Sequence, residues 1–564
     1  MADDGGHCRF FVAPMAAQMI LAQPGDMKMK PSMVVGSGTS APVVPLAPVA
    51  IPPSIIGGIS AMIPVPQSAP VHIPRPPQQA QHQVVPRAIG DIHSNDRIVI
   101  SPHPTRPDLQ VLHLHLSSLA DQTHAVNLPA CFHVNARLGA GSYGAVISAT
   151  KTHPDTGVKE EVAIKIQYLS VHDMDHMRYA YRELAILEWA RSVPRRSLLS
   201  CLEVLPLDHD TMATSAHLLV VTPRYEMSLE TWCKEHASVF AKSERLWKSY
   251  PMNSKAYQDH QKDYQKAYRE HEARVIPIIW KILDAVNVMH SHGLCHRDVS
   301  CSNILMNLKD EAVVLGDFGA CRSIDGSKSP LPLSPWVTTI WFRAPELLYH
   351  GDYPTPIPPS ADVKTDPFVY SYTTAIDMWS VGVILARMLN GGRVLTSPFI
   401  TDEGRTDHRD HFHSWIPWLG NPTESDWKSL SVPAGSSFRT KMQHVDTRTL
   451  GPKWSHLLPY ASPEAVDLVR RLLRWNPQER LTAEAALAQP FFASMPVPTA
   501  PRCATTSPSI EKALWPSTKE DPKVNAARFH QWMKLLWEVP LRLHPNYQAM
   551  YRDWCRANEA ALSK

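Results

Sequence analysis

The chain has 564 residues, which is too many for one compact hydrophobic core, so we expect one large domain with appended segments. Its 56 Lys and Arg nearly balance its 53 Asp and Glu, and the basic residues are scattered, so a nucleic-acid partner is not expected. Residues 10–22 are apolar but shorter than the roughly 20 residues of a membrane helix, so neither a membrane span nor a signal peptide is expected. The nine cysteines are widely spaced and odd in number, which indicates reduced thiols in an intracellular protein of the cytoplasm or nucleus.

The N-terminal quarter differs in composition from the rest of the chain. Proline is dense there, as in residues 41–53 and 74–86, while charged and aromatic residues are few. Such a segment cannot bury enough apolar surface to offset the entropy of ordering. We therefore predict a disordered segment over 1–125, a folded domain over 126–495, and a linker with a helical extension over 496–564.

Within the folded domain, short apolar runs predict an antiparallel β start with one helix and a further strand (132–134, 145–147, 162–166, 184–189 and 218–221). The pattern then becomes mainly helical. An exposed helical insertion is predicted over 238–272, and apolar helices over 275–290, 376–389 and 464–473. The fold class is therefore α+β and bilobal, with a small antiparallel β-rich lobe up to about residue 222 and a larger helical lobe from about 223.

Three glycines, Gly139, Gly141 and Gly144, lie between two predicted strands. Glycines at this spacing let backbone amides approach a polyphosphate without Cβ clashes. On its own the pattern fits equally well an ordinary hairpin turn or a dinucleotide-binding fingerprint. Alternation along the next strand would aim Lys165 under this loop, and Glu183 on the following helix could position the buried ammonium group.

The strongest motif is the run His296-Arg297-Asp298, which is followed by Asn303 and, beyond a predicted strand-turn-strand, by Asp317-Phe318-Gly319. Asp298 can accept the proton of a hydroxyl group. The amide oxygen of Asn303 and the carboxylate of Asp317 are the hard oxygen ligands that Mg²⁺ prefers. This constellation predicts phosphoryl transfer.

With these motifs in order, and with Ala344-Pro345-Glu346, the run from Asp377 to Gly382 and Arg480 further on, residues 131–492 resemble the eukaryotic protein kinase family. The resemblance implies ATP and Mg²⁺ as cofactors. It implies that Lys165 holds the α- and β-phosphates, that Glu183 pairs with it, that Asp298 orients the substrate hydroxyl, and that Asn303 and Asp317 bind the metal. It further implies a structural ion pair of Glu346 with Arg480, and bracing of the catalytic loop by Asp377.

The same resemblance implies a nucleotide site that joins the glycine loop, the strand after it and the hinge at 223–225. Thr222 would guard the back of the adenine pocket. The residues implied to contact the nucleotide are Leu138, Gly139, Ala140, Gly141, Ser142, Tyr143, Gly144, Val146, Ala163, Lys165, Thr222 and Tyr225.

Residues 338–346, 418–427 and 472–483 are similar to the cyclin-dependent and mitogen-activated (CMGC) group, whose members phosphorylate serine or threonine, often before proline. This implies protein substrates and an upstream activating kinase. Ser334 stands where the cyclin-dependent kinases carry their activating threonine, and three arginines match those that hold its phosphate (Arg182, Arg297 and Arg322). Ser334 can equally be one of several loop serines. A cyclin partner is not implied, because the helix before Glu183 lacks the cyclin-binding sequence.

One position departs from the family pattern. Ser300 stands where a lysine usually contacts the transferred phosphate, and losing such a charge is worth roughly 3–4 kcal/mol of transition-state stabilisation. Two function classes therefore compete, an active serine/threonine kinase and a nucleotide-binding pseudokinase that acts as a scaffold. The complete set of catalytic residues favours the enzyme.

Overall fold

The computed structural model describes most of the chain beyond residue 86. The described residues are 87–90, 97–115, 123–141, 144–170, 174–193, 197–205, 215–324, 337–351, 372–396, 408–432, 434–442, 454, 458–496, 533–538, 548, 552 and 556. Three predicted site residues, Ser142, Tyr143 and Ser334, lie outside these ranges. Among the helices of the described ranges, none combines the length and the apolar character that crossing a membrane requires.

A five-stranded antiparallel sheet in the order β5-β6-β7-β9-β8 forms the centre of the N-terminal lobe (β5 Phe132–Gly141, β6 Gly144–Thr152, β7 Lys159–Ser170, β8 Glu203–Leu205, β9 Ser215–Pro223). Helix α1, Met174–Ser192, packs against β7. Strand β7 alternates over residues 162–166, where the β-branched Val162, Ile164 and Ile166 are buried on one face and Lys165 lies on the other. The predicted β start is confirmed.

Before this sheet the chain forms a second, four-stranded antiparallel sheet in sequential order (β1 Arg87–Gly90, β2 Arg97–Pro102, β3 Leu109–His115, β4 Thr123–Pro129). The prediction of disorder over 1–125 was therefore wrong from residue 87 onward, and the expected boundary at residue 126 falls inside β4. The dense proline ends at residue 86, and beyond it apolar and polar residues alternate, as at Leu112-His113-Leu114-His115. Composition averaged over the whole segment concealed this period of two.

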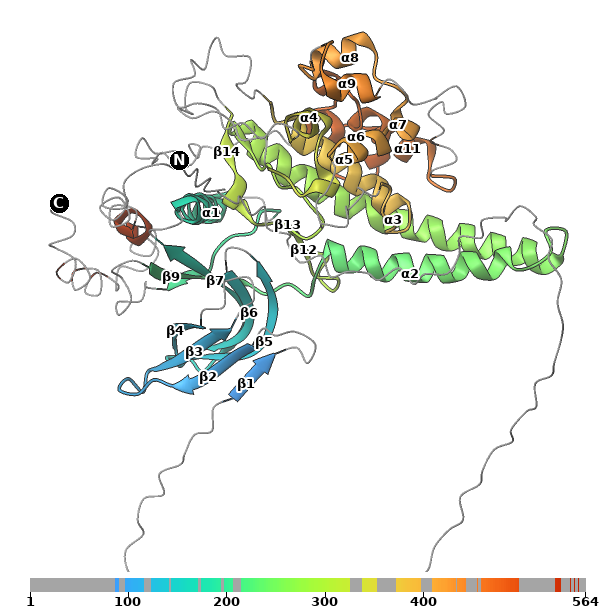
Figure 1. Cartoon of the computed structure of the whole chain (residues 1–564). Helices are drawn as coiled ribbons and strands as arrows, with labels where there is room; N and C mark the ends of the chain where they lie inside the picture. Colours follow the sequence, from blue (N-terminus) through green and yellow to red (C-terminus); the bar gives the residue numbers. More distant parts are fainter. Residues whose placement is uncertain are drawn as a thin grey trace, which may run out of the picture. The chain divides into compact units, whose positions relative to one another are not determined.

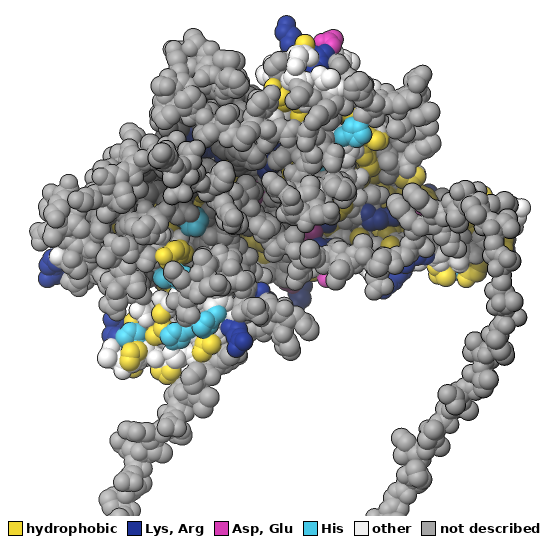
Figure 2. Space-filling model, in the orientation of Figure 1, with side chains coloured by type: hydrophobic (Ala, Val, Ile, Leu, Met, Phe, Trp, Pro, Cys, Tyr) yellow, Lys and Arg dark blue, Asp and Glu magenta, His cyan; other side chains and the backbone are white. Residues whose placement is uncertain are grey.

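The two sheets share one hydrophobic core. Ile98, Leu112 and Val126 of the N-terminal sheet are fully buried against Ile147 and Ile164 of the five-stranded sheet. The N-terminal sheet thus covers the face of the lobe opposite α1; in Figure 1 its strands are blue, and the colour of the five-stranded sheet changes from blue to blue-green. Histidine and apolar side chains gather over the N-terminal sheet in Figure 2.

The C-terminal lobe is mainly helical (α2 Leu229–Lys248, α3 Lys255–Ser291, α4 Pro345–Gly351, α5 Ala375–Leu389, α6 His408–Ser414, α7 Ile416–Leu419, α8 Glu424–Ser429, α9 Ser437–Met442, α11 Pro463–Leu472 and α12 Ala483–Leu487). Helix α5 is buried from Ile376 to Leu389 and forms its centre. Short strands and 3₁₀ turns connect the catalytic segments (β10 Met227–Ser228, β11 Leu294–Cys295, β12 Ile304–Met306, β13 Val313–Leu315, β14 Arg322–Ser323, η2 Phe318–Ala320, η3 Ile340–Phe342, η4 Pro477–Glu479 and η5 Pro490–Phe492). The bilobal α+β prediction is confirmed.

The predicted helical insertion at 238–272 is part of a hairpin in which α2 and α3 lie side by side (Figure 1). The helical assignment is confirmed, but α3 continues without a break to Ser291 and therefore includes the helix predicted over 275–290. The insertion is also less exposed than predicted. Phe240, Tyr264 and Tyr268 form a small buried cluster, and His271 contacts the carbonyl oxygen of Met388 at 2.8 Å.

The C-terminal extension is helical over residues 533–538, as predicted for part of 496–564. Met533, Leu536 and Trp537 of this helix are fully buried in the main hydrophobic core. Side chains with such burial make the extension an integral part of the fold.

Candidate active site

A partly buried charge network joins the two lobes at the predicted nucleotide site. The Nζ atom of Lys165 donates to both carboxylate oxygens of Glu183 at 2.8 Å, and to Asp317 at 3.0 Å. Gln167, two residues along β7, donates to Glu183 as well. Burial acts to lower the pKa of Lys165, but the two carboxylates outweigh burial and raise it, so the ammonium stays charged.

The catalytic loop holds Asp298 in a fixed position. The backbone amide and the hydroxyl of Thr339 donate to Oδ1 of Asp298 at 2.8 and 3.0 Å, and Nδ2 of Asn303 donates to Oδ2 at 2.9 Å. Burial, followed by the nearby carboxylate of Asp317, raises the pKa of Asp298 above its usual value. Thr339 thus holds one oxygen of the carboxylate and Asn303 holds the other. A carboxylate that is fixed in this way and has a raised pKa is suited to accept a proton.

Asp377 of α5 supports the catalytic loop through hydrogen bonds to its backbone. Its two carboxylate oxygens accept hydrogen bonds from the backbone amides of His296 and Arg297 at 2.8 and 2.9 Å, and from His290 at 2.9 Å. The loop needs such support because Arg297 has a φ of 68°, in the left-handed region that non-glycine residues rarely adopt. The bracing role implied for Asp377 has the geometry that it requires.

Asp317 and Asn303 lie on neighbouring segments. The amide of Gly316 donates to the carbonyl oxygen of Asn303 at 2.8 Å, and Asp317 has a φ of 60° where η2 begins. Although burial acts to raise it, the pKa of Asp317 is lowered by Lys165, so this carboxylate stays ionised. Asn303 and Asp317 thus offer an amide oxygen and a charged carboxylate, which fit a hard divalent cation such as Mg²⁺.

The glycine loop leaves room for a polyphosphate. A Cβ atom at Gly139 would meet nothing within 4 Å, whereas one at Gly144, whose φ is +142°, would lie 1.8 Å from the carbonyl oxygen of Ile166. Gly144 is therefore required by the fold and Gly139 borders open space, which fits the close approach of a ligand. Ala140 and Gly141 lie at the end of β5.

The other predicted nucleotide residues border the same space. Ala163 and Thr222 are paired across β7 and β9, and Tyr225 lies two residues beyond the end of β9. Leu138 is 45% exposed although it is large and apolar, and Val146 is half-buried on β6. An adenine ring above these side chains would cover apolar surface that is otherwise in water.

Two arginine groups predicted from the sequence are also in place. Both guanidinium ends of Arg480 pair with Glu346 at 2.7 and 2.8 Å, as the resemblance implied. Arg182, Arg297 and Arg322 are buried, and they converge. Burial raises the pKa of the Cys321 thiol well above its usual value, and the charges of Arg297 and Arg182 oppose this rise. Burial likewise raises the pKa of Tyr372 to about 12, against the charges of Arg297 and Arg322.

Some functional side chains escaped the sequence analysis. Thr339 was noted only as part of the run 338–346, yet it donates to Asp298; its place just before η3 gave no local signal for that contact. Arg343 also went unnoticed. Its guanidinium donates to the carbonyl oxygens of Val337 and Thr338 at 3.0 and 2.8 Å.

Ser300, which replaces the usual lysine, is fully buried, and its hydroxyl lies 2.9 Å from that of Ser302. Within the described residues, neutral donors alone hydrogen-bond the Asp298 carboxylate. The structure therefore supplies no hydrogen-bonding cation beside Asp298 in place of the missing lysine.

Comparison with known proteins gives the same assignment. The family model for the protein kinase domain matches residues 132–492. Mitogen-activated protein kinase spk1 of Schizosaccharomyces pombe is 27% identical over 383 residues, which cover 67% of this chain and 83% of that protein. Extracellular signal-regulated kinase 2 of Dictyostelium discoideum is 27% identical over 365 residues, 64% of this chain and 79% of that protein. Cyclin-dependent kinase F-3 of Oryza sativa subsp. japonica is 34% identical over 232 residues, 41% of this chain and 45% of that protein. This chain therefore belongs to the protein kinase family, in its CMGC group.

Proposed function

We propose that this chain transfers the γ-phosphate of ATP to serine and threonine hydroxyls of protein substrates, with Mg²⁺. The observation that carries the proposal is the joint placement of Asp298, held by Thr339 and Asn303, beside the ion-paired Lys165, Glu183 and Asp317. Bound ATP with Mg²⁺ would supply the phosphoryl group and neutralise its charge. Lys165 would hold the phosphates, Asn303 and Asp317 would hold the metal, and Asp298 would accept the hydroxyl proton.

The experiment measures transfer of labelled phosphate from ATP to a serine peptide by the full chain, with Asp317→Asn and Asp298→Asn as controls. Both substitutions should reduce transfer to background, because the first removes a metal ligand and the second the proton acceptor. A scaffold without catalysis, which Ser300 favours as the second candidate, would give equal signals for the unsubstituted chain and both variants.

The backbone before η3 supports a preference for proline directly after the phosphorylated residue. Thr338 has a φ of 67°, and Arg343 occupies the carbonyl oxygens of Val337 and Thr338. A substrate residue that lies against this segment would find these acceptors taken, and a buried amide left without an acceptor costs about 1–3 kcal/mol. Proline has no amide hydrogen and avoids that cost.

The preference can be measured with two peptides that carry proline or alanine after the serine. We expect the proline peptide to have a kcat/KM higher by roughly 5- to 150-fold. Equal values for the two peptides would exclude the preference and leave the kinase activity untouched.

Activation by phosphorylation of Ser334 is the second finer proposal. The buried Nε and Nη1 atoms of Arg297 make no hydrogen bond within the described residues, so this guanidinium has donors available for a phosphate. Arg182 and Arg322 would add charge from α1 and β14. Phosphorylated protein should therefore be more active, and a Ser334→Ala variant treated with the same upstream kinase should not gain activity.

A further inference from the structure

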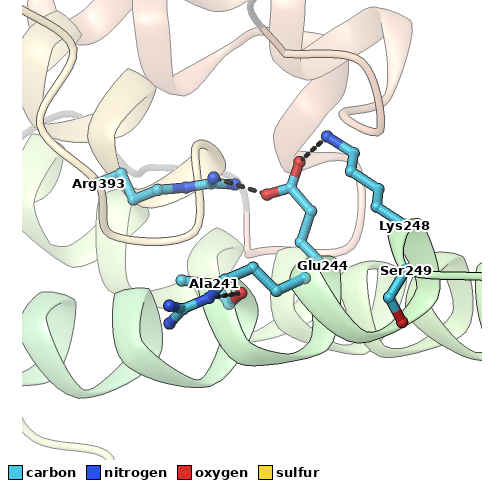
Figure 3. Close-up of a pocket in the computed structure, with 6 residues that line it drawn as sticks. Ala241, Glu244, Lys248, Ser249 and Arg393 are labelled. Atoms are coloured by element: carbon cyan, nitrogen blue, oxygen red, sulfur yellow. Dashed lines mark hydrogen bonds and ion pairs between the residues drawn. The ribbon is translucent and has the colours of Figure 1, made fainter. Parts of the chain in front are cut away.

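The hairpin of α2 and α3 carries a pocket that the proposed catalytic function does not use. The pocket has a volume of about 490 Å³. Its walls come from the second half of α2 and from the loop that follows α5 (Ala241, Glu244, Arg245, Lys248, Ser249 and Arg393). Figure 3 shows Glu244 between Lys248 and Arg393, to which it is joined by ion pairs.

This pocket has more positive than negative charge. The carboxylate of Glu244 is shared between Lys248 at 2.5 Å and Arg393 at 2.7 Å. Burial acts to raise the pKa of Glu244, but these two hydrogen bonds outweigh burial and lower it, so its single negative charge persists. Arg245 donates from Nε to the carbonyl oxygen of Ala241 at 3.2 Å and faces no acidic group within the described residues. The pocket is therefore lined by three cations and one carboxylate.

The surrounding sequence adds to this imbalance. Residues 241–255 contain Lys242 and Lys255 in addition to Arg245 and Lys248, and Glu244 is their one acidic residue. Leu246 and Met252 are 50% and 74% exposed on the same part of the hairpin. A ligand with several negative charges and some apolar surface complements such a surface.

The pocket lies at a defined distance from the catalytic loop. Helix α2 begins beside this loop, where the amide of Glu230 donates to the carbonyl oxygen of Cys301 at 3.0 Å. Arg387 of α5 fixes the same end through an ion pair with Glu230 at 2.5 Å. At 1.5 Å per residue, Arg245 lies about 22 Å further along the helix. An extended chain needs about seven residues to span that distance.

We infer that the pocket is a docking site for an acidic segment of the protein substrate, at least about seven residues from the serine or threonine that is phosphorylated. This inference rests on the proposed kinase function and adds a substrate class to it. Docking raises the effective concentration of the acceptor without contacting the reacting atoms. It therefore lowers the KM of the substrate and leaves kcat unchanged.

The test uses the full chain and synthetic peptides in which a Ser-Pro acceptor is separated by ten Gly/Ser residues from a tract of six glutamates or six glutamines. The tract is placed before the acceptor in one pair and after it in the other. We expect the glutamate peptide of one pair to have a KM about tenfold lower, with the same kcat. Raising NaCl from about 50 to 500 mM should reduce this difference, because salt screens exposed charges.

Two charge reversals on the hairpin provide the matched comparison. Arg245→Glu should abolish the advantage of the glutamate tract without changing the rate on the glutamine peptide. Lys262→Glu makes the same charge change on an exposed position of α3 outside the pocket and should retain the advantage. Equal KM values for the glutamate and glutamine peptides in both pairs would overturn the inference. An equal loss of the advantage of the glutamate tract in Arg245→Glu and Lys262→Glu would overturn it too. The inference would also be overturned if single-stranded RNA inhibited phosphorylation of the glutamate peptide and the free glutamate tract did not.

If the chain has no kinase activity, no peptide is phosphorylated, and this result differs from those that would overturn docking alone. Fluorescence anisotropy of a labelled hexaglutamate peptide still reports docking in that case. Weaker binding to Arg245→Glu than to Lys262→Glu supports the pocket, and equal binding to both excludes it.

Discussion

Replacing Leu112 by alanine tests whether the N-terminal sheet is part of the kinase lobe. Leu112 lies in the middle of β3, paired with Ile100 and Val126 on the neighbouring strands, and it is completely buried between the two sheets. Truncating a fully buried leucine removes its packing contacts and leaves a cavity, which together cost about 2–5 kcal/mol. Leu112→Ala should therefore reduce the free energy of unfolding by that amount.

The control is the preceding residue on the same strand. Val111 points to the opposite face, where it is half-buried and paired with Ser101 and Asn127. Val111→Ala should change the free energy of unfolding by less than about 1 kcal/mol. The assay is urea unfolding of the full chain, followed by tryptophan fluorescence, with the two variants and the unsubstituted protein side by side.

Leu112→Ala should also affect the active site. Ile164 and Ile166 of β7 contact the shared core, and Lys165 lies between them on the opposite face. Loosening that core should raise the KM for ATP, because Lys165 is then held less firmly against Glu183. An unchanged urea midpoint for Leu112→Ala, or equal shifts for both variants, would refute the packing of the two sheets described above.

Substitutions at four further positions separate structural from catalytic roles. Glu346→Gln leaves a buried guanidinium without its carboxylate and should cost about 3–5 kcal/mol in the same urea assay. Thr339→Ala removes a hydrogen bond that lowers the pKa of Asp298, so the acidic limb of the profile of kcat/KM against pH should move to higher pH, and Thr339→Ser should restore it. Gly144→Ala should prevent folding of the lobe, whereas Gly139→Ala should preserve the melting temperature and weaken ATP binding in a calorimetric titration.

The catalytic residues could be predicted from the sequence because most of them are close together in the chain. Asp298, Asn303 and Asp317 lie within one loop and the hairpin after it, so their spacing alone fixes how they can meet. Lys165 was predictable from the period of two on its strand. The contact of Asp377 with the backbone of the catalytic loop spans about eighty residues, and it was available only through the resemblance to the family.

The parts that could not be predicted depend on contacts between distant segments. The sequence of β3 alone does not show that Leu112 packs against β7. The alternation of apolar and polar residues indicates only that one face of the strand is buried. The hairpin of α2 and α3 gives a similar lesson. Its polar composition predicted exposure, yet Tyr268 and His271 are buried because the end of α5 offers carbonyl oxygens to both. Tertiary partners decided burial in each case.

Burial, followed by the carboxylate of Asp317, raises the pKa of Asp298, and with Ser300 in place of the usual lysine no lysine charge opposes this rise. A lysine beside Asp298 would favour its ionised form through charge attraction, and here that attraction is missing while Asp317 repels. Three neutral donors, two from Thr339 and one from Asn303, offset part of the loss by holding the carboxylate oxygens. Activity should therefore disappear at a higher pH on acidification than an ordinary aspartate would allow. Because the metal ligands and Lys165 do not depend on residue 300, the replacement should weaken charge stabilisation during transfer more than it weakens binding of the nucleotide.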